Sequence, residues 1–222
     1  MTRGDMKDLL GSQLQDTGDT EWSDARKNLY LNLGLQFIQT KILEINPEAY
    51  QEISKTDIVY SGGDFDDLIA KPQGLLRILK VWLKYSTDTD YVQATHKRRD
   101  QLISAGNNND PSYLWAHKGR WIQIHPVPLA SSTDGCRLEF VPTLSMGADT
   151  DVPDVPLVAH RGIVYAARLE ALAETGEDTD PQTTQAIQAK LGEILSRMAT
   201  YYTSEQGEVD QIEVGLNPTD GW

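Results

Sequence analysis

Few residues of this chain stand at spacings that support catalysis or metal binding. The histidines at positions 96, 117, 125 and 160 never form the HxxxH or HExxH spacing that places two imidazoles on one metal ion. A zinc site from His117 and His125 would need these two to meet across a predicted hairpin, together with a carboxylate. Histidines on a hairpin surface are the more common arrangement, so we expect neither a metal nor another cofactor.

The acidic residues offer no clear catalytic pair. Asp64, Asp66 and Asp67 resemble the start of a calcium loop, but Leu75 occupies the position of the bidentate glutamate, which favours a solvated turn. The nucleophile elbow, the P-loop and the dinucleotide fingerprint are absent from the sequence. Nothing in the sequence places two carboxylates across one cleft. We therefore expect a protein that is not an enzyme, with an Asp/Glu hydrolase as an alternative.

The sequence has one basic run and one cysteine. Lys97, Arg98 and Arg99 form either a solvated helix face or a contact for an acidic partner or a phosphate, and we take them as candidate partner-binding residues. Cys136 stands alone, which excludes an intramolecular disulfide, and its alternating apolar surroundings predict a buried thiol.

The charge limits the classes of partner. The 222 residues include 33 Asp/Glu and 20 Lys/Arg, a net charge of −13. Such a balance argues against wrapping nucleic acid and against anionic membrane surfaces. It is also uneven, because residues 1–73, 74–142 and 143–222 carry −6, +3 and −10. No apolar stretch is long enough to cross a bilayer, and the first residues lack the apolar region of a secretory signal.

Helical periodicity marks both ends of the chain. We predict helices over residues 5–14, 21–46 and 157–173, and a last helix from Asp180 and Pro181 to Tyr202. Two adjacent apolar stripes of the helix 21–46 predict a wide core-facing surface. The first comprises Trp22, Ala25, Leu29, Leu33 and Phe37, and the second Leu31, Leu35, Ile38, Ile42 and Ile45.

The middle of the chain has the alternating pattern of strands. We predict strands within residues 52–85, a hairpin of residues 113–117 and 120–125, a strand over 136–141, and a weak helix over 90–104. The predicted fold is α+β: a bundle of helices from both termini with an inserted antiparallel β-sheet or hairpin region and an extended C-terminal tail. The domain boundaries would be 1–50, 51–142, 143–205 and 206–222. The polar connection 142–156 is longer than a compact domain usually carries without a use for it.

The C-terminal arm, residues 206–222, combines acidic and apolar residues. A short alternation of Ile212, Val214 and Leu216 precedes Trp222. Tryptophan is enriched where proteins bind one another. We therefore take these four residues as candidate partner-binding residues of an arm that orders on a neighbouring subunit or partner, with a floppy end as the alternative.

Several local signatures occur in one order along the chain. They are Trp22 at the start of the second helix, Pro72 before the strand that reaches Val81, the segment 111–128 ending in Ile-x-Ile-x-Pro-x-Pro, the strand 138–141, and the helix opened by residues 152–160 with Tyr165-Ala-Ala. Over residues 5–205 this order resembles the head-to-tail adaptor (connector) proteins of tailed bacteriophages, which dock beneath the portal ring.

This resemblance implies a structural virion protein. Such adaptors form a ring, commonly of twelve copies, between portal and tail. Their helical part lines or surrounds the DNA channel, their C-terminal segment often reaches the portal, and their β part meets the next neck or tail component. The implied partners are copies of the chain, the portal, a tail or neck protein, and passing double-stranded DNA without sequence-specific binding, with no membrane. The implied location is the virion neck, and the host cytoplasm during assembly.

The charge pattern fits a ring around DNA. An acidic channel keeps the duplex weakly bound, so that it slides. A closed ring needs two different complementary patches on each copy, and the +3 middle and the −10 C-terminal third offer them. A neck stopper or tail-completion protein and a non-viral acidic binding domain are the alternatives.

Overall fold

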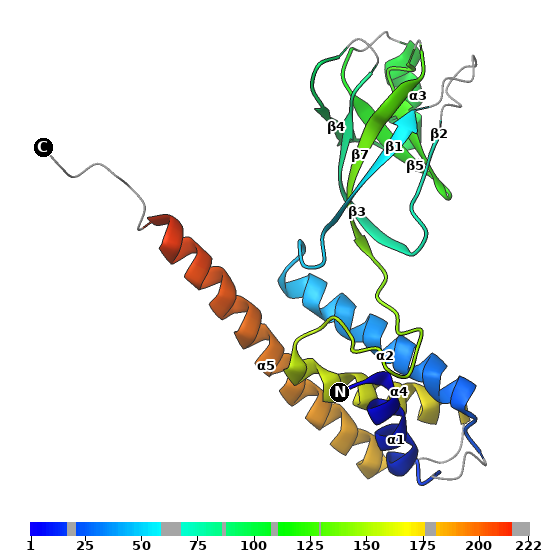
Figure 1. Ribbon diagram of the computed structural model, residues 1–222, viewed down its shortest axis with the longest axis vertical. Coiled ribbons are helices and arrows are strands. Elements are labelled where there is room, and N and C mark those ends of the chain that lie inside the picture. The colour runs from blue at the N-terminus through cyan, green and yellow to red at the C-terminus, as the bar shows by residue number, and fades with distance from the viewer. Residues whose placement is uncertain are drawn as a thin grey trace, which may run out of the picture. The chain divides into compact units, whose positions relative to one another are not determined.

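The computed structural model describes residues 1–16, 21–58, 68–85, 88–107, 111–128, 130–175 and 181–214. The chain divides into two compact units, each described by itself. The helical unit comprises residues 1–49 and 144–222, and the β unit comprises residues 50–143. Most elements of both are labelled in Figure 1.

Four α-helices and a short 3₁₀ turn build the described part of the helical unit. They are α1 (Arg3–Gln13), α2 (Asp24–Ile45), η1 (Leu157–Ala159), α4 (His160–Thr175) and α5 (Pro181–Val214). Thr2 and Asp5 begin α1 with a capping box, and the Ser23 side chain caps α2 by accepting from the Arg26 amide. The helix α2 packs on α4, and α4 packs on α5.

Only one of the two apolar stripes of α2 lies in the core. Leu31, Leu35, Ile38 and Ile42 are fully buried, as predicted. Leu29, Leu33 and Phe37 are instead 55%, 38% and 37% exposed, so the prediction of one wide core face was wrong. The reason is that α4 approaches only one side of α2. This approach is close: a Cβ on Gly34 would lie 2.4 Å from the Ile163 carbonyl oxygen.

The β unit is a mixed sheet with one helix. Its described elements are β1 (Glu52–Ile58), β2 (Leu68–Ala70), β3 (Leu75–Leu83), β4 (Val92–His96), α3 (Arg99–Asn107), β5 (Leu114–Lys118), β6 (Trp121–His125) and β7 (Ser132–Pro142). The seven strands lie in the order β1-β7-β3-β4-β5-β6-β2, and the sheet is nearly closed, like a barrel.

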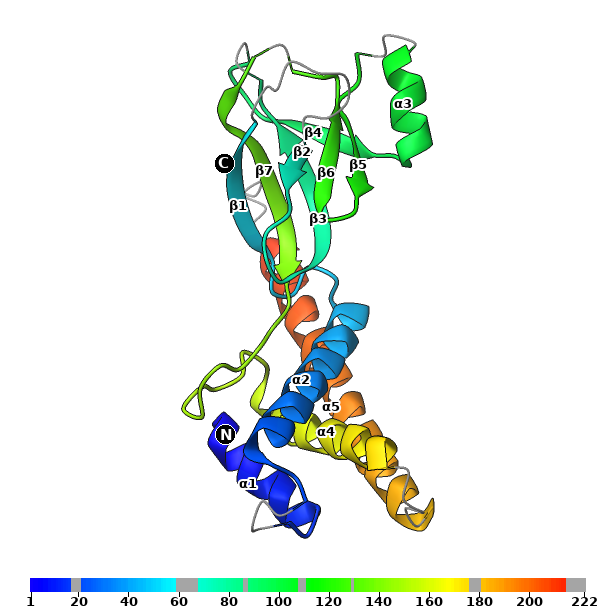
Figure 2. The ribbon, with the colours of Figure 1, turned by 90° about the vertical axis from the view of Figure 1, so that its right-hand side faces the viewer.

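The predicted fold class was therefore wrong. The middle of the chain is not a small antiparallel insertion, because β4 and β5 pair in parallel and the sheet nearly closes on itself. Parallel neighbours need a crossover connection, and here the segment between them contains α3, which packs against β5 and β6 (Figure 2). The sequence pattern suggested one weak helix over 90–104, whereas Val92–His96 is a strand and the helix begins at Arg99.

The described part of the β unit buries the Cys136 thiol and the Glu139 carboxylate. Cys136 is fully buried, and burial raises the pKa of its thiol to about 12. Glu139, only 4% exposed, accepts hydrogen bonds from Trp82 Nε1 at 2.9 Å and Gln51 Nε2 at 3.1 Å. Arg137 at 2.8 Å and Lys80 at 3.5 Å complete its partners. This carboxylate is therefore paired at each oxygen.

The extended tail was predicted to begin too early. The helix α5 continues without a break through Gly207 to Val214, so most of the predicted arm is helical along its backbone. Among the described residues, none of the helices combines the length and apolar character needed to cross a membrane.

Candidate interaction surfaces

A wide cleft lies in the β unit. A cleft of about 1080 Å³ is bordered by residues 70–79 and by residues of β4, β5, the β5–β6 turn and the start of β6. We call it the β3 cleft. Gly74 and Gly119 stand at two of its turns with φ values of 69° and 58°, a backbone conformation that favours glycine. The turns therefore bring together residues that lie far apart in sequence.

The β3 cleft is basic. Lys71, Arg77 and Arg120 line it, and its lining residues, all of them described, include no carboxylate. The Lys71 ammonium donates to the Gly119 carbonyl at 2.6 Å, and the Arg120 guanidinium lies 5.0 Å from the centre of the Trp121 ring. Such a site favours anionic groups.

Aromatic rings form another part of the cleft wall. The ring centroids of His96 and Trp115 are 4.5 Å apart, and those of Trp115 and His117 are 4.9 Å apart. Burial lowers the pKa of His117, and the positive charges of Lys71 and His96 lower it further. Lysine and arginine, not His117, therefore supply the positive charge at neutral pH.

The structure does not bring His117 and His125 together. Across the hairpin, His117 pairs with Ile122, whereas His125 pairs with Leu114 at the opposite end. In the described ranges, no three His, Cys, Asp or Glu side chains form a metal-binding group. Asp64, Asp66 and Asp67 lie outside the described residues.

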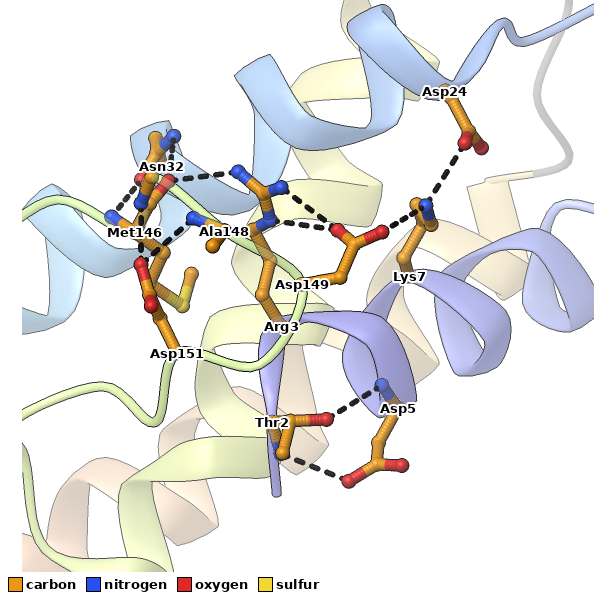
Figure 3. A network of polar contacts seen from close by, with 11 residues as sticks. Thr2, Arg3, Asp5, Lys7, Asp24, Asn32, Met146, Ala148, Asp149 and Asp151 are labelled. Carbon is orange, nitrogen blue, oxygen red and sulfur yellow. Dashed lines mark hydrogen bonds and ion pairs between the residues drawn. The ribbon is translucent and has the colours of Figure 1, made fainter.

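In the helical unit, ion pairs fix the long connection 144–156. Figure 3 shows Asp149 between two cations of α1: Arg3 donates at 2.8 and 3.0 Å, and Lys7 at 3.0 Å. Lys7 also binds Asp24 at the start of α2, 2.9 Å away. Hydrogen bonds from Lys7 and Arg3 lower the pKa of Asp149. Asp149 thus ties the connection to α1, and Lys7 ties α1 to α2.

Hydrogen bonds to α2 hold the same connection. The Asn32 amide accepts from the Met146 backbone at 2.8 Å and donates to its carbonyl at 3.3 Å (Figure 3). Gln39 accepts from the Leu144 amide at 3.1 Å, and the Met146 side chain is buried. The length of this connection therefore has a structural use, since it covers one side of α2.

Three apolar side chains remain exposed on α2. Leu29, Leu33 and Phe37 follow one another at four-residue intervals and are all exposed. We call these three residues the α2 stripe. Contiguous exposed apolar side chains are typical of surfaces that bind another protein.

The predicted basic run lies beside the β3 cleft but outside its lining. Lys97 and Arg98 connect β4 to α3, Arg99 begins α3, and all three are exposed. Arg98 pairs with Asp100 at 3.4 Å on the surface. The true cleft cations were missed because Lys71, Arg77 and Arg120 form no run in the sequence. The strand alternation around Arg77 is the one sequence signal that could have indicated a role for this residue.

The predicted arm residues are only partly described. Ile212 and Val214 belong to the last turn of α5, where the backbone alone is described. Leu216 and Trp222 lie outside the described residues.

Comparison with known families gives one result. A family model described as "SU10 adaptor protein" matches residues 1–211. No curated protein matches the chain.

Proposed function

The chain belongs to the SU10 adaptor protein family of phage adaptors, and from this membership we propose that it is a head-to-tail adaptor that forms a ring between portal and tail. The observation that carries the proposal is the match over residues 1–211, which spans both units. Family membership indicates a structural role and an association with portal and tail components. A twelve-copy ring in the virion neck is the arrangement that we propose, assembled in the host cytoplasm.

The α2 stripe supports the ring. Three exposed apolar side chains on one helix are unfavourable in water, and contact with a neighbouring copy would bury them. A closed ring needs a heterologous contact, in which the stripe of one copy meets a different surface of the next. We assign this contact to the stripe.

The charge distribution supports passage of DNA. Residues 1–49 and 144–222 carry 9 Lys/Arg and 22 Asp/Glu, a net charge of −13, whereas residues 50–143 carry 11 of each. A ring whose helical units surround the channel presents like charge to the phosphates, so the duplex is held weakly and slides. The acidic composition of the helical unit therefore fits its proposed place around the DNA channel.

Within this proposal, the basic run remains a candidate site for binding a partner protein. Lys97, Arg98 and Arg99 are exposed cations of the β unit and suit an acidic surface of a tail or neck protein.

A single substitution on the stripe tests the ring. We expect Leu33→Asp to abolish the ring that the wild-type protein forms on purified portal, because a charge would lie in the apolar contact. The fold should survive, since Leu33 is 38% exposed in the single chain. Native mass spectrometry and cryo-electron microscopy of the portal complex read the outcome.

The matched control is Ile53→Asp, an exposed apolar side chain of the β unit. We expect this variant to assemble normally. A wild-type chain that forms no ring on the portal would refute the proposal, and a ring that tolerates Leu33→Asp would remove the stripe from it.

A further inference from the structure

Part of one edge of β3 has no described strand beside it. The strand β7 pairs with β3 from Leu75 to Leu83, whereas β4 pairs with β3 only from Val81 to Leu83. On the β4 side, residues 75–79 therefore lack a partner strand within the described ranges. These same five residues line the β3 cleft. An unpaired edge offers backbone N–H and C=O groups to an added strand.

The side chains of the cleft select the kind of strand. Leu76 is 44% exposed, and Trp115 and Trp121 line the same cleft, which provides apolar contacts. Arg77 is exposed and pairs with no described carboxylate. An extended segment that carries both apolar and acidic residues matches this surface.

The chain itself contains such a segment. The C-terminal arm, residues 206–222, has no Lys or Arg, and the part of it that follows α5 carries Asp220. The helix α5 ends at Val214, so residues 215–222 follow it as a stretch that spans about 26 Å when extended. The edge 75–79 needs only about 17 Å of strand. Leu216 and Trp222 supply apolar side chains, and Pro218 is compatible with an edge strand.

We propose that residues 215–222 of one copy add as a strand to the β3 edge in the cleft of a second copy. Asp220 meets the three cations of the cleft, and Leu216 and Trp222 meet Leu76 and the two tryptophans. The inference rests on the proposed ring, because neighbouring copies raise the effective concentration of the arm at the cleft.

Single-stranded nucleic acid also combines negative charge with groups that stack on aromatic rings. It cannot extend a β-sheet, so the open edge of β3 favours a polypeptide.

Peptide binding tests the inference without a ring. The probe is a fluorescent peptide of residues 215–222. The receptor is the full chain carrying Leu216→Asp and Trp222→Asp, so that its own arm does not compete. We expect saturable binding in fluorescence anisotropy, weakened about tenfold by Arg77→Glu, since charge reversal replaces an attraction by a repulsion. Lys55→Glu, the same change at an exposed lysine outside the cleft, should leave the affinity unchanged.

Hydrogen exchange identifies the mode of binding. Strand addition should protect backbone amides among residues 75–79 when the peptide is added, whereas a purely electrostatic contact would not. The inference is overturned by a peptide that does not bind, by a scrambled peptide that binds equally well, or by an oligothymidylate that binds and displaces the peptide.

The outcomes separate the two proposals. A ring on the portal without peptide binding refutes the arm contact alone. Peptide binding with protection of the β3 edge, but without a ring, refutes the ring alone.

Discussion

The helical and β units differ in where they place their polar groups. The helical unit carries the whole net charge of the chain, and its main polar network, around Asp149, lies partly exposed at the surface. The β unit is neutral, and its main polar network surrounds the buried Glu139. An exposed network contributes little free energy and responds to solvent conditions, whereas a buried one is costly to disturb. The polar contacts of the helical unit should therefore respond to pH and salt more than those of the β unit.

Backbone contact between helices should dominate the stability of the helical unit. We expect Gly34→Ala to destabilise the protein by about 3 kcal/mol, because the new Cβ would lie 2.4 Å from the Ile163 carbonyl oxygen and the two helices would have to separate. Urea denaturation followed by circular dichroism measures the change.

The matched control is Gly192→Ala on α5. Nothing lies within 4 Å of a Cβ at this position, so the substitution should stabilise by about 0.5–1 kcal/mol through helix propensity. Equal effects of the two substitutions would contradict the close packing of α2 on α4.

The buried carboxylate of Glu139 should contribute strongly to the stability of the β unit. We expect Glu139→Gln to cost about 2 kcal/mol, less than a fully buried pair because Lys80 and Arg137 are partly exposed. The rate at which Cys136 reacts with a thiol reagent reports on this unit alone, since its burial and raised pKa prevent reaction until the unit opens.

Glu52→Gln, at an exposed position on β1, should leave the labelling rate of Cys136 unchanged. If Glu139→Gln also leaves the labelling rate unchanged, the polar network around Glu139 does not stabilise the β unit. The proposed difference between the polar networks of the two units would then be wrong.

The smallest expected effect is a pH dependence of the helical unit. The lowered pKa of Asp149 means that its ionised form is stabilised in the folded state. Its contribution to stability is therefore present above the ordinary aspartate pKa of 3.8 and is lost as the pH falls through the lower folded pKa. We expect Asp149→Asn to be less stable than the wild type at neutral pH, and the two curves to converge in acid.

Asp154→Asn serves as the control, because Asp154 lies exposed on the same connection and pairs with no described cation. Its stability curve should run parallel to that of the wild type. Thermal denaturation between pH 2 and pH 7 measures these curves. If the curves of the wild type and of Asp149→Asn do not converge in acid, the Asp149 carboxylate is not the source of the pH dependence.

The local pattern of the sequence predicted most elements of both units. Helical periodicity located α2 within three residues at its start and one at its end, and alternation located β3 and the β5–β6 hairpin. The errors arose where pairing partners decide the structure. Residues 92–96 have no strong alternation, and they become a strand because β3 and β5 lie on either side. Likewise, both stripes of α2 are apolar, and only the position of α4 decides which is buried.

For the candidate sites as well, the sequence indicated local features, whereas tertiary contacts decided which residues come together. The run Lys97–Arg99 was visible in the sequence because its charges are adjacent, but it does not line the β3 cleft. The cleft is lined by Lys71, Arg77 and Arg120, and their spacing in the sequence did not predict this.

The sequence by itself determined the composition, the acidic character, most helices and strands, and the order of motifs that resembles the adaptor family. These properties depend on neighbouring residues and on covalent order. The tertiary structure alone decided that the sheet is mixed and nearly closed, which face of α2 stays exposed, and that three distant cations share one cleft. Such features depend on contacts between residues far apart in the chain, whose free energies no local pattern contains.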